Sequence, residues 1–125
     1  MKTELELPPL GALAKEIYRR LVRHVRAGND SITYGELATL VSAKHPTHPR
    51  SSRLHAALGE VTTACRLRDL PILPAIVWRA DAHHPSDGYY AVAHPRARSW
   101  KSQLAAWQVE HERVLRDRRR FPGAL

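Results

Sequence analysis

The chain has 125 residues, of which 43% are hydrophobic and 26% are charged, and this composition excludes a wholly disordered chain. Its length fits one domain, so we expect a single domain over residues 1–125, with loose ends at 1–9 and 121–125. The lone cysteine, Cys65, excludes an intrachain disulfide. The net charge of +8 predicts a polyanionic partner, either a nucleic acid or an acidic protein, although host codon bias alone would also produce it.

The sequence has neither the pattern of an export signal nor that of a membrane span. Residues 1–7 alternate charged and apolar side chains, and Pro8 and Pro9 interrupt any apolar run. The longest apolar stretch lies around Ile72–Trp78 and is far too short to cross a bilayer. We therefore expect a cytoplasmic protein without a membrane partner.

The first predicted helix covers residues 10–27, because its apolar side chains recur every three or four residues and form one buried stripe. The stripe consists of Leu10, Leu13, Ile17, Leu21 and Val25. Next, Gly28–Asp30 supplies residues that tolerate the left-handed backbone conformation found at helix ends.

A second, short helix is predicted over residues 34–42. It begins with a capping box, in which the Thr33 hydroxyl accepts a hydrogen bond from the Glu36 amide and the Glu36 carboxylate reaches back to the cap. The segment 43–50 is predicted to be a loop, because two prolines prevent helix continuation.

A third helix is predicted from Ser51 or Ser52 to about Leu67. Its inward positions are Leu54, Leu58, Val61 and Cys65. The second and third helices together form a helix-turn-helix-like pair, with a loop longer than is usual for that motif.

The segments 71–78 and 89–93 are predicted to be two strands of a hairpin, joined by a polar loop that contains the turn dipeptide Asp87-Gly88. A last helix begins after Ser99 and ends in the basic run 116–120. These elements predict an α+β fold of the winged-helix type, with three N-terminal helices, a β-hairpin wing and a C-terminal helix.

Four segments, in this order, resemble the DNA-binding domain of the O6-alkylguanine-DNA alkyltransferases and the alkyltransferase-like proteins. They are Ile32–Ala38, Ala57–Gly59, Leu70–Pro74 and Asp87–Tyr89. The resemblance covers about half of the chain and implies a winged-helix domain that binds DNA.

The chain departs from this family at the residues that carry its chemistry. The family's alkyl-accepting cysteine corresponds to Ala75, the histidine and arginine after it to Ile76–Val77, and the base-displacing arginine to Ala56. Cys65 lies on an inward stripe and cannot replace the acceptor. Of the family's functional residues only Tyr34 is matched, and the resemblance implies that it contacts the DNA backbone. We therefore expect no alkyl transfer, which needs a thiolate activated by a base.

The start of the third helix is the best candidate for binding nucleic acid, because amides, hydroxyls and guanidinium groups gather there as phosphate binding requires. Some residues on the outward face of the helix would continue this contact. The predicted binding residues are Tyr34, Arg50, Ser51, Ser52, Arg53, His55, Thr62 and Arg66. A purely structural alternative is that the serines only cap the helix and Tyr34 packs beside its own cap.

Several other residues have two interpretations each. The small-residue strip Ala56, Gly59 and Thr63 would either approach a DNA groove or pack against another helix. The side chains Arg79, His83 and His84 would either follow the DNA backbone or form a solvated loop. Finally, Trp100 and Trp107 would either anchor the last helix in the core or form a hot spot for a protein partner.

No metal site, cofactor or catalytic residue is expected. His45 and His48 are three residues apart, but prolines separate them and no Cys or acidic residue is near enough in sequence to complete a zinc site. Ser51 or Ser52 with His55 lacks the Asp or Glu that would orient the histidine for nucleophilic catalysis.

The sequence thus predicts a non-catalytic nucleic-acid-binding protein whose expected partner is duplex DNA. The alternative is a protein-interaction module, such as an adaptor, an inhibitor or a subunit of a bacterial assembly, and an exposed apolar patch around Trp100 and Trp107 would favour it. A third possibility is an enzyme or sensor with a pocket for a modified base or a small ligand, lined by Tyr34, Ala75 and Tyr89.

Overall fold

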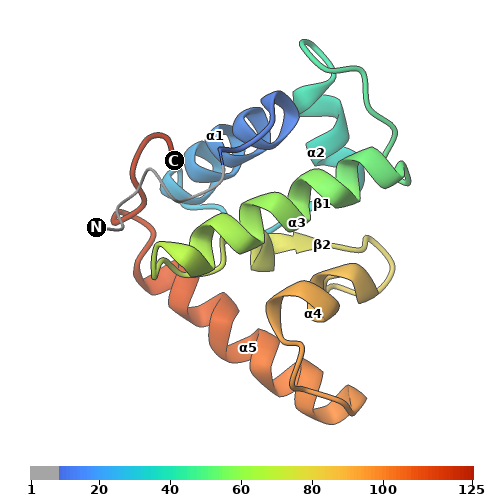
Figure 1. Cartoon of the computed structure of the whole chain (residues 1–125), viewed down its shortest axis with the longest axis vertical. Helices are drawn as coiled ribbons and strands as arrows, with labels where there is room; N and C mark the ends of the chain where they lie inside the picture. Colours follow the sequence, from blue (N-terminus) through green and yellow to red (C-terminus); the bar gives the residue numbers. More distant parts are fainter. Residues whose placement is uncertain (1–8) are drawn as a thin grey trace.

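The computed structural model describes residues 9–125 of the chain. In chain order its elements are α1 (Ala12–Arg26), β1 (Ile32–Thr33), α2 (Tyr34–Val41), α3 (Ser52–Leu67), the 3-10 helix η2 (Leu73–Ile76), β2 (Val77–Trp78), α4 (Asp87–Ala93) and α5 (Trp100–Arg116). Figure 1 shows α3 crossing the middle of the molecule, with α1 and α2 on one side and α4 and α5 on the other. The predicted loose N-terminal end lies outside the described residues, except for Pro9.

The predicted helices before residue 68 are confirmed. All five residues of the α1 stripe are buried and belong to one hydrophobic cluster, which also includes the inward side of α3. The chain leaves α1 through Gly28, whose φ of +98° is a conformation that only glycine adopts without strain. Cys65 is fully buried, as its place on the inward stripe predicts.

The capping box of α2 is also present. The Glu36 amide donates to Thr33 Oγ1 over 3.1 Å, and the Thr33 amide donates to Glu36 Oε1 over 2.9 Å. Two amides that the helix cannot satisfy from within are therefore paired.

Removing this cap should destabilise the protein modestly. We expect Thr33→Ala to lower the free energy of unfolding by about 1 kcal/mol, because the Glu36 amide loses its acceptor. Urea denaturation of both proteins measures the difference. The matched control is Thr39→Ala, whose exposed hydroxyl only bonds back to the Gly35 carbonyl and should leave stability nearly unchanged. Equal losses in the two variants would contradict the prediction.

The predicted α+β fold of the winged-helix type is wrong: residues 9–125 are mostly helical and contain no β-hairpin wing. The sheet of the described residues has two strands, β1 and β2, which pair in parallel with Ile32 opposite Val77 and Thr33 opposite Trp78. A hairpin would be antiparallel and would join consecutive strands. The expected strand over 71–78 shortens to two residues because Pro74 has no amide to donate to a ladder, and it lies instead near the start of η2, where a proline is tolerated.

The expected returning strand over 89–93 is the helix α4. Asp87 stands in its first turn, where a carboxylate interacts favourably with the helix dipole. The buried residues Tyr89, Tyr90 and Ala93 are spaced as in a helix, and α4 packs against α3. The dipeptide Asp87-Gly88 therefore begins a helix rather than turning a hairpin.

The helix α5 begins as predicted, with Ser99 accepting a hydrogen bond from the Ser102 amide over 3.1 Å. Its side chains form two hydrogen bonds with the backbone of the η2 segment. Glu110 accepts a hydrogen bond from the Ile72 amide over 2.7 Å, and the buried Trp107 donates its indole N–H to the Ala75 carbonyl over 2.9 Å. Trp107 is thus a core anchor.

The C-terminal residues contact α1. The prediction of a loose end at 121–125 is therefore wrong for Phe121 and Pro122. Phe121 is buried, and its carbonyl accepts a hydrogen bond from Arg26. The Tyr18 hydroxyl bonds to the Pro122 carbonyl over 2.5 Å. Figure 1 accordingly places the C-terminus beside α1. Over residues 9–125, none of the helices combines the length and hydropathy needed to cross a bilayer.

Candidate nucleic-acid interface

An open groove of about 610 Å³ brings together three segments that are far apart in sequence. They are the start of α2, the end of the loop before α3 with the first turn of that helix, and the loop 79–86 between β2 and α4. The groove is lined by Thr33, Tyr34, Gly35, Pro49, Arg50, His55, Arg79, Ala80, Asp81 and Ser86. It therefore contains three of the predicted binding residues, namely Tyr34, Arg50 and His55.

Tyr34 forms a fixed wall of this groove. Its ring stacks on His55 with 5.1 Å between the ring centroids. Its hydroxyl accepts a hydrogen bond from the Ser86 amide over 3.0 Å and lies 3.0 Å from the Ser86 hydroxyl. Tyr34 thus joins α2 to α3 and to the loop 79–86, and its hydroxyl is engaged within the protein.

The predicted binding residues at the start of α3 have different roles: one caps the helix and the others are exposed. Ser51 is the cap, because its hydroxyl accepts a hydrogen bond from the Leu54 amide over 3.0 Å. Ser52, Arg50 and Arg53 are exposed. In residues 9–125 neither arginine is within ion-pair distance of a carboxylate, so both guanidinium groups are available to an anion.

Arg79 also lines the groove. It is held there by a tight turn, in which its amide donates to the His84 carbonyl over 2.8 Å. Its guanidinium group donates to Asp81 over 3.0 Å, so part of its charge is balanced. From the sequence, Arg79 is one of the wing residues that would follow the DNA backbone. In the structure it lies on the loop 79–86 and lines the same groove as Arg50.

Two predicted binding residues lie elsewhere. Thr62 is buried, and its hydroxyl bonds back to the Leu58 carbonyl over 3.0 Å, so its predicted outward position is wrong. The helix α4, which occupies the place of the expected wing, packs over this part of α3. Arg66 is exposed but lies about 20 Å along the helix axis from Arg53, and it donates to the Val92 carbonyl over 2.9 Å.

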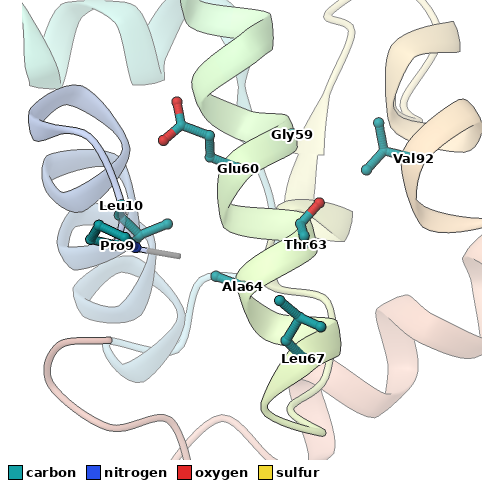
Figure 2. A pocket seen from close by; sticks show the side chains of 8 residues that line it. All are labelled: Pro9, Leu10, Gly59, Glu60, Thr63, Ala64, Leu67 and Val92. Carbon is teal, nitrogen blue, oxygen red and sulfur yellow. The ribbon is translucent and has the colours of Figure 1, made fainter. Parts of the chain in front are cut away.

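The small-residue strip borders a second, largely apolar hollow of about 280 Å³ between α3, α4 and the segment that precedes α1 (Figure 2). Gly59 and Thr63 line this hollow together with Leu67 and Val92. The Glu60 carboxylate also lines it and accepts a hydrogen bond from the Gly11 amide over 3.0 Å at the start of α1. The lining of this hollow has a carboxylate and no cation, whereas the groove is lined by Arg50 and Arg79, so the groove is the better candidate for nucleic acid.

A pocket for a modified base is not supported. Tyr34 and Tyr89 do line a common cavity with Pro74, but its volume is about 20 Å³, which suits a single water molecule. Ala75 is fully buried and is not among the residues that line it.

Tyr89, which lines this cavity, and His94 beside it are held in their neutral forms. The Tyr89 hydroxyl lies 2.9 Å from His94 Nε2. Burial raises the pKa of Tyr89 and lowers the pKa of His94, so neither group carries a charge near neutral pH. In the described part of the chain, no three His, Cys, Asp or Glu side chains gather as metal ligands would.

The two tryptophans of α5 differ in their surroundings. Trp107 is buried, whereas the Trp100 side chain is 49% exposed and packs on His84 with 4.8 Å between ring centroids. They do not form the joint apolar patch that would favour a protein-interaction module. His84 therefore supports an aromatic side chain, while His83 is exposed.

The chain was compared with protein-family models, curated proteins and solved structures, and none of them matches it.

Proposed function

We propose that this chain binds nucleic acid, with duplex DNA as its principal partner, through the groove between α2, α3 and the loop 79–86. The observation that carries the proposal is the convergence of Arg50, His55 and Arg79 on one open groove, with Arg53 beside it on the first turn of α3. A groove lined by two arginines suits a phosphate backbone, and the one carboxylate of its lining, Asp81, is paired with Arg79.

The electrostatics of the whole chain support the same partner. Its net charge of +8 attracts a polyanion over distances comparable to the Debye length. Arg50 and Arg53 are exposed and reach no carboxylate within residues 9–125, so binding a phosphate breaks no ion pair of theirs. The resemblance of Ile32–Ala38 to the DNA-binding domain of the alkyltransferases agrees with the place of Tyr34 in the groove wall.

The experiment is fluorescence anisotropy with labelled duplex DNA, single-stranded DNA and RNA, across a series of salt concentrations. We expect wild-type affinity for the duplex to fall steeply with salt, because each neutralised phosphate releases counterions. Arg50→Ala/Arg53→Ala should weaken duplex binding about tenfold or more and reduce the slope of log K against log salt by about 2.

The matched control removes the same charge from a surface outside the groove. Lys15 and Arg23 lie on the exposed side of α1, which contributes no residue to the groove lining. We expect Lys15→Ala/Arg23→Ala to bind nearly as tightly as the wild type. If both double variants lose the same affinity, or neither loses any, the groove is not the binding site.

A further inference from the structure

Three exposed basic residues lie close in sequence to an exposed aromatic ring where α4 connects to α5. These four residues, here called the Trp100 patch, are Arg96, Arg98, Trp100 and Lys101. None of the three cations forms an ion pair with another of the residues 9–125. The sequence has no Asp or Glu from Gly88 to Val109. The patch therefore carries three positive charges that no carboxylate of residues 9–125 approaches within ion-pair distance.

The Trp100 ring is held in place although half of it is open to solvent. It packs on the His84 ring and meets Tyr90 edge to face, with 5.6 Å between the centroids. The capping box of Ser99 and Ser102 fixes the backbone on either side of it. A ring that is already positioned loses little conformational entropy when a flat partner stacks on it.

The patch lies across the loop 79–86 from the groove. At one end of this loop, the Ser86 amide donates a hydrogen bond to the Tyr34 hydroxyl in the groove. The ring of His84, in the same loop, packs against the ring of Trp100. Ser86 and His84 are two residues apart, which is at most about 7 Å of chain. Figure 1 shows the loop before α3, the loop 79–86 and the start of α5 along the same side of the molecule.

We infer that the Trp100 patch binds unpaired nucleotides of a strand that leaves the duplex held in the groove, an inference that rests on the proposed function. An exposed tryptophan stacks on the face of a base, and such faces are free in single strands but covered in a duplex. The surrounding cations neutralise the phosphates on either side of the stacked base. The preferred ligand is then a duplex with a single-stranded extension.

The test compares a short blunt duplex with the same duplex carrying an extension of a few nucleotides. We expect the extension to raise wild-type affinity about tenfold, which corresponds to stacking one base. Trp100→Leu should abolish this gain and leave blunt-duplex affinity unchanged, while Trp100→Phe should keep part of it. Intrinsic fluorescence should be quenched by the extended duplex in the wild type and much less in Trp100→Leu, because Trp100 is the exposed tryptophan, whereas Trp107 is buried and Trp78 is half-buried.

A second variant and a second ligand distinguish base stacking from simple attraction between charges. Arg98→Ala/Lys101→Ala keeps the aromatic ring and should reduce both the gain and its salt dependence. Poly-glutamate has the charge of nucleic acid but no bases, and it should neither quench Trp100 nor compete with the extension. An extension without benefit, a gain that survives Trp100→Leu, or equal quenching by poly-glutamate would overturn the inference. If single strands quench Trp100 but the blunt duplex does not bind, the proposed function fails and the Trp100 patch stands as a single-strand site.

Discussion

Replacing Trp107 by alanine should cause the largest loss of stability of any change considered for this protein, about 3–5 kcal/mol in the free energy of unfolding. Trp107 is 7% exposed, contacts Trp78 edge to face at 5.7 Å and stacks on His111. Its indole N–H also satisfies the Ala75 carbonyl, which accepts a second hydrogen bond from Trp78 Nε1 over 3.2 Å. The variant loses apolar burial and one of these hydrogen bonds together.

Urea denaturation followed by far-ultraviolet circular dichroism measures this loss without relying on tryptophan emission. The control is Trp100→Ala, in which a half-exposed ring is removed from the same helix and the expected loss is about 1 kcal/mol or less. Trp107→Phe keeps most of the apolar volume and should lie between the two. A Trp107→Ala protein as stable as Trp100→Ala would show that α5 does not depend on this anchor.

Glu16 should stabilise the fold in a pH-dependent manner. Its side chain is 5% exposed and is covered by the side chains of Arg19, Arg20 and Lys44, with the Arg20 guanidinium group 2.9 Å away. Burial raises the pKa of Glu16, but the hydrogen bond from Arg20 and the three positive charges outweigh it, so the pKa lies below its usual value of 4.5. A carboxyl group with a lowered pKa in the folded state favours folding when it is ionised.

The lowered pKa of Glu16 determines how its contribution to stability changes with pH. The contribution is complete above the usual pKa of an unfolded glutamate and disappears as the pH falls through the lowered folded pKa. We expect Glu16→Gln to lower the free energy of unfolding by about 2 kcal/mol near neutral pH, the value of a charge-assisted hydrogen bond. The difference from wild type should shrink as the pH falls below about 4.

Chemical denaturation at several pH values checks this prediction. The matched control is Glu112→Gln, because Glu112 is exposed on α5 and has no ion pair within residues 9–125. It should have little effect at any pH. A Glu16→Gln deficit that is the same at pH 3 and pH 7 would mean that packing rather than charge accounts for it.

Local patterns predicted the helices well. The stripe of α1, the capping box of Thr33 and Glu36, and the Ser99 cap depend on residues within a turn or two of one another, so spacing alone identifies them. The hairpin failed because a short apolar run after Asp87-Gly88 fits a strand and a helix equally well. Only packing against α3 decides between them, and the parallel pairing of β1 with β2 joins segments 45 residues apart.

The sequence identified those residues of the candidate site that lie close together at the start of one helix, α3. Arg50 and Arg53 are identified by their place before and within the first turn of α3. The burial of Thr62 follows from the position of α4, which was not recognised. Ser86 was missed altogether, because it reaches the groove only through its bond to Tyr34, 52 residues away in sequence. A polar residue before a helix start offered no signal beyond that of an ordinary cap.

The attachment of the C-terminal residues to α1 has a consequence for the order in which the molecule folds. The contacts of Tyr18 with Pro122, Arg26 with Phe121 and Arg118 with the Val25 carbonyl close loops of 93 to 104 residues. Closing such loops costs more entropy than closing the short ones between neighbouring helices, so these contacts form after the α1–α3 core has assembled. Until then the Val25 carbonyl lacks its Arg118 donor. Pulse-labelling amide exchange during refolding should accordingly show protection in the centre of α3 before it shows protection in residues 118–122.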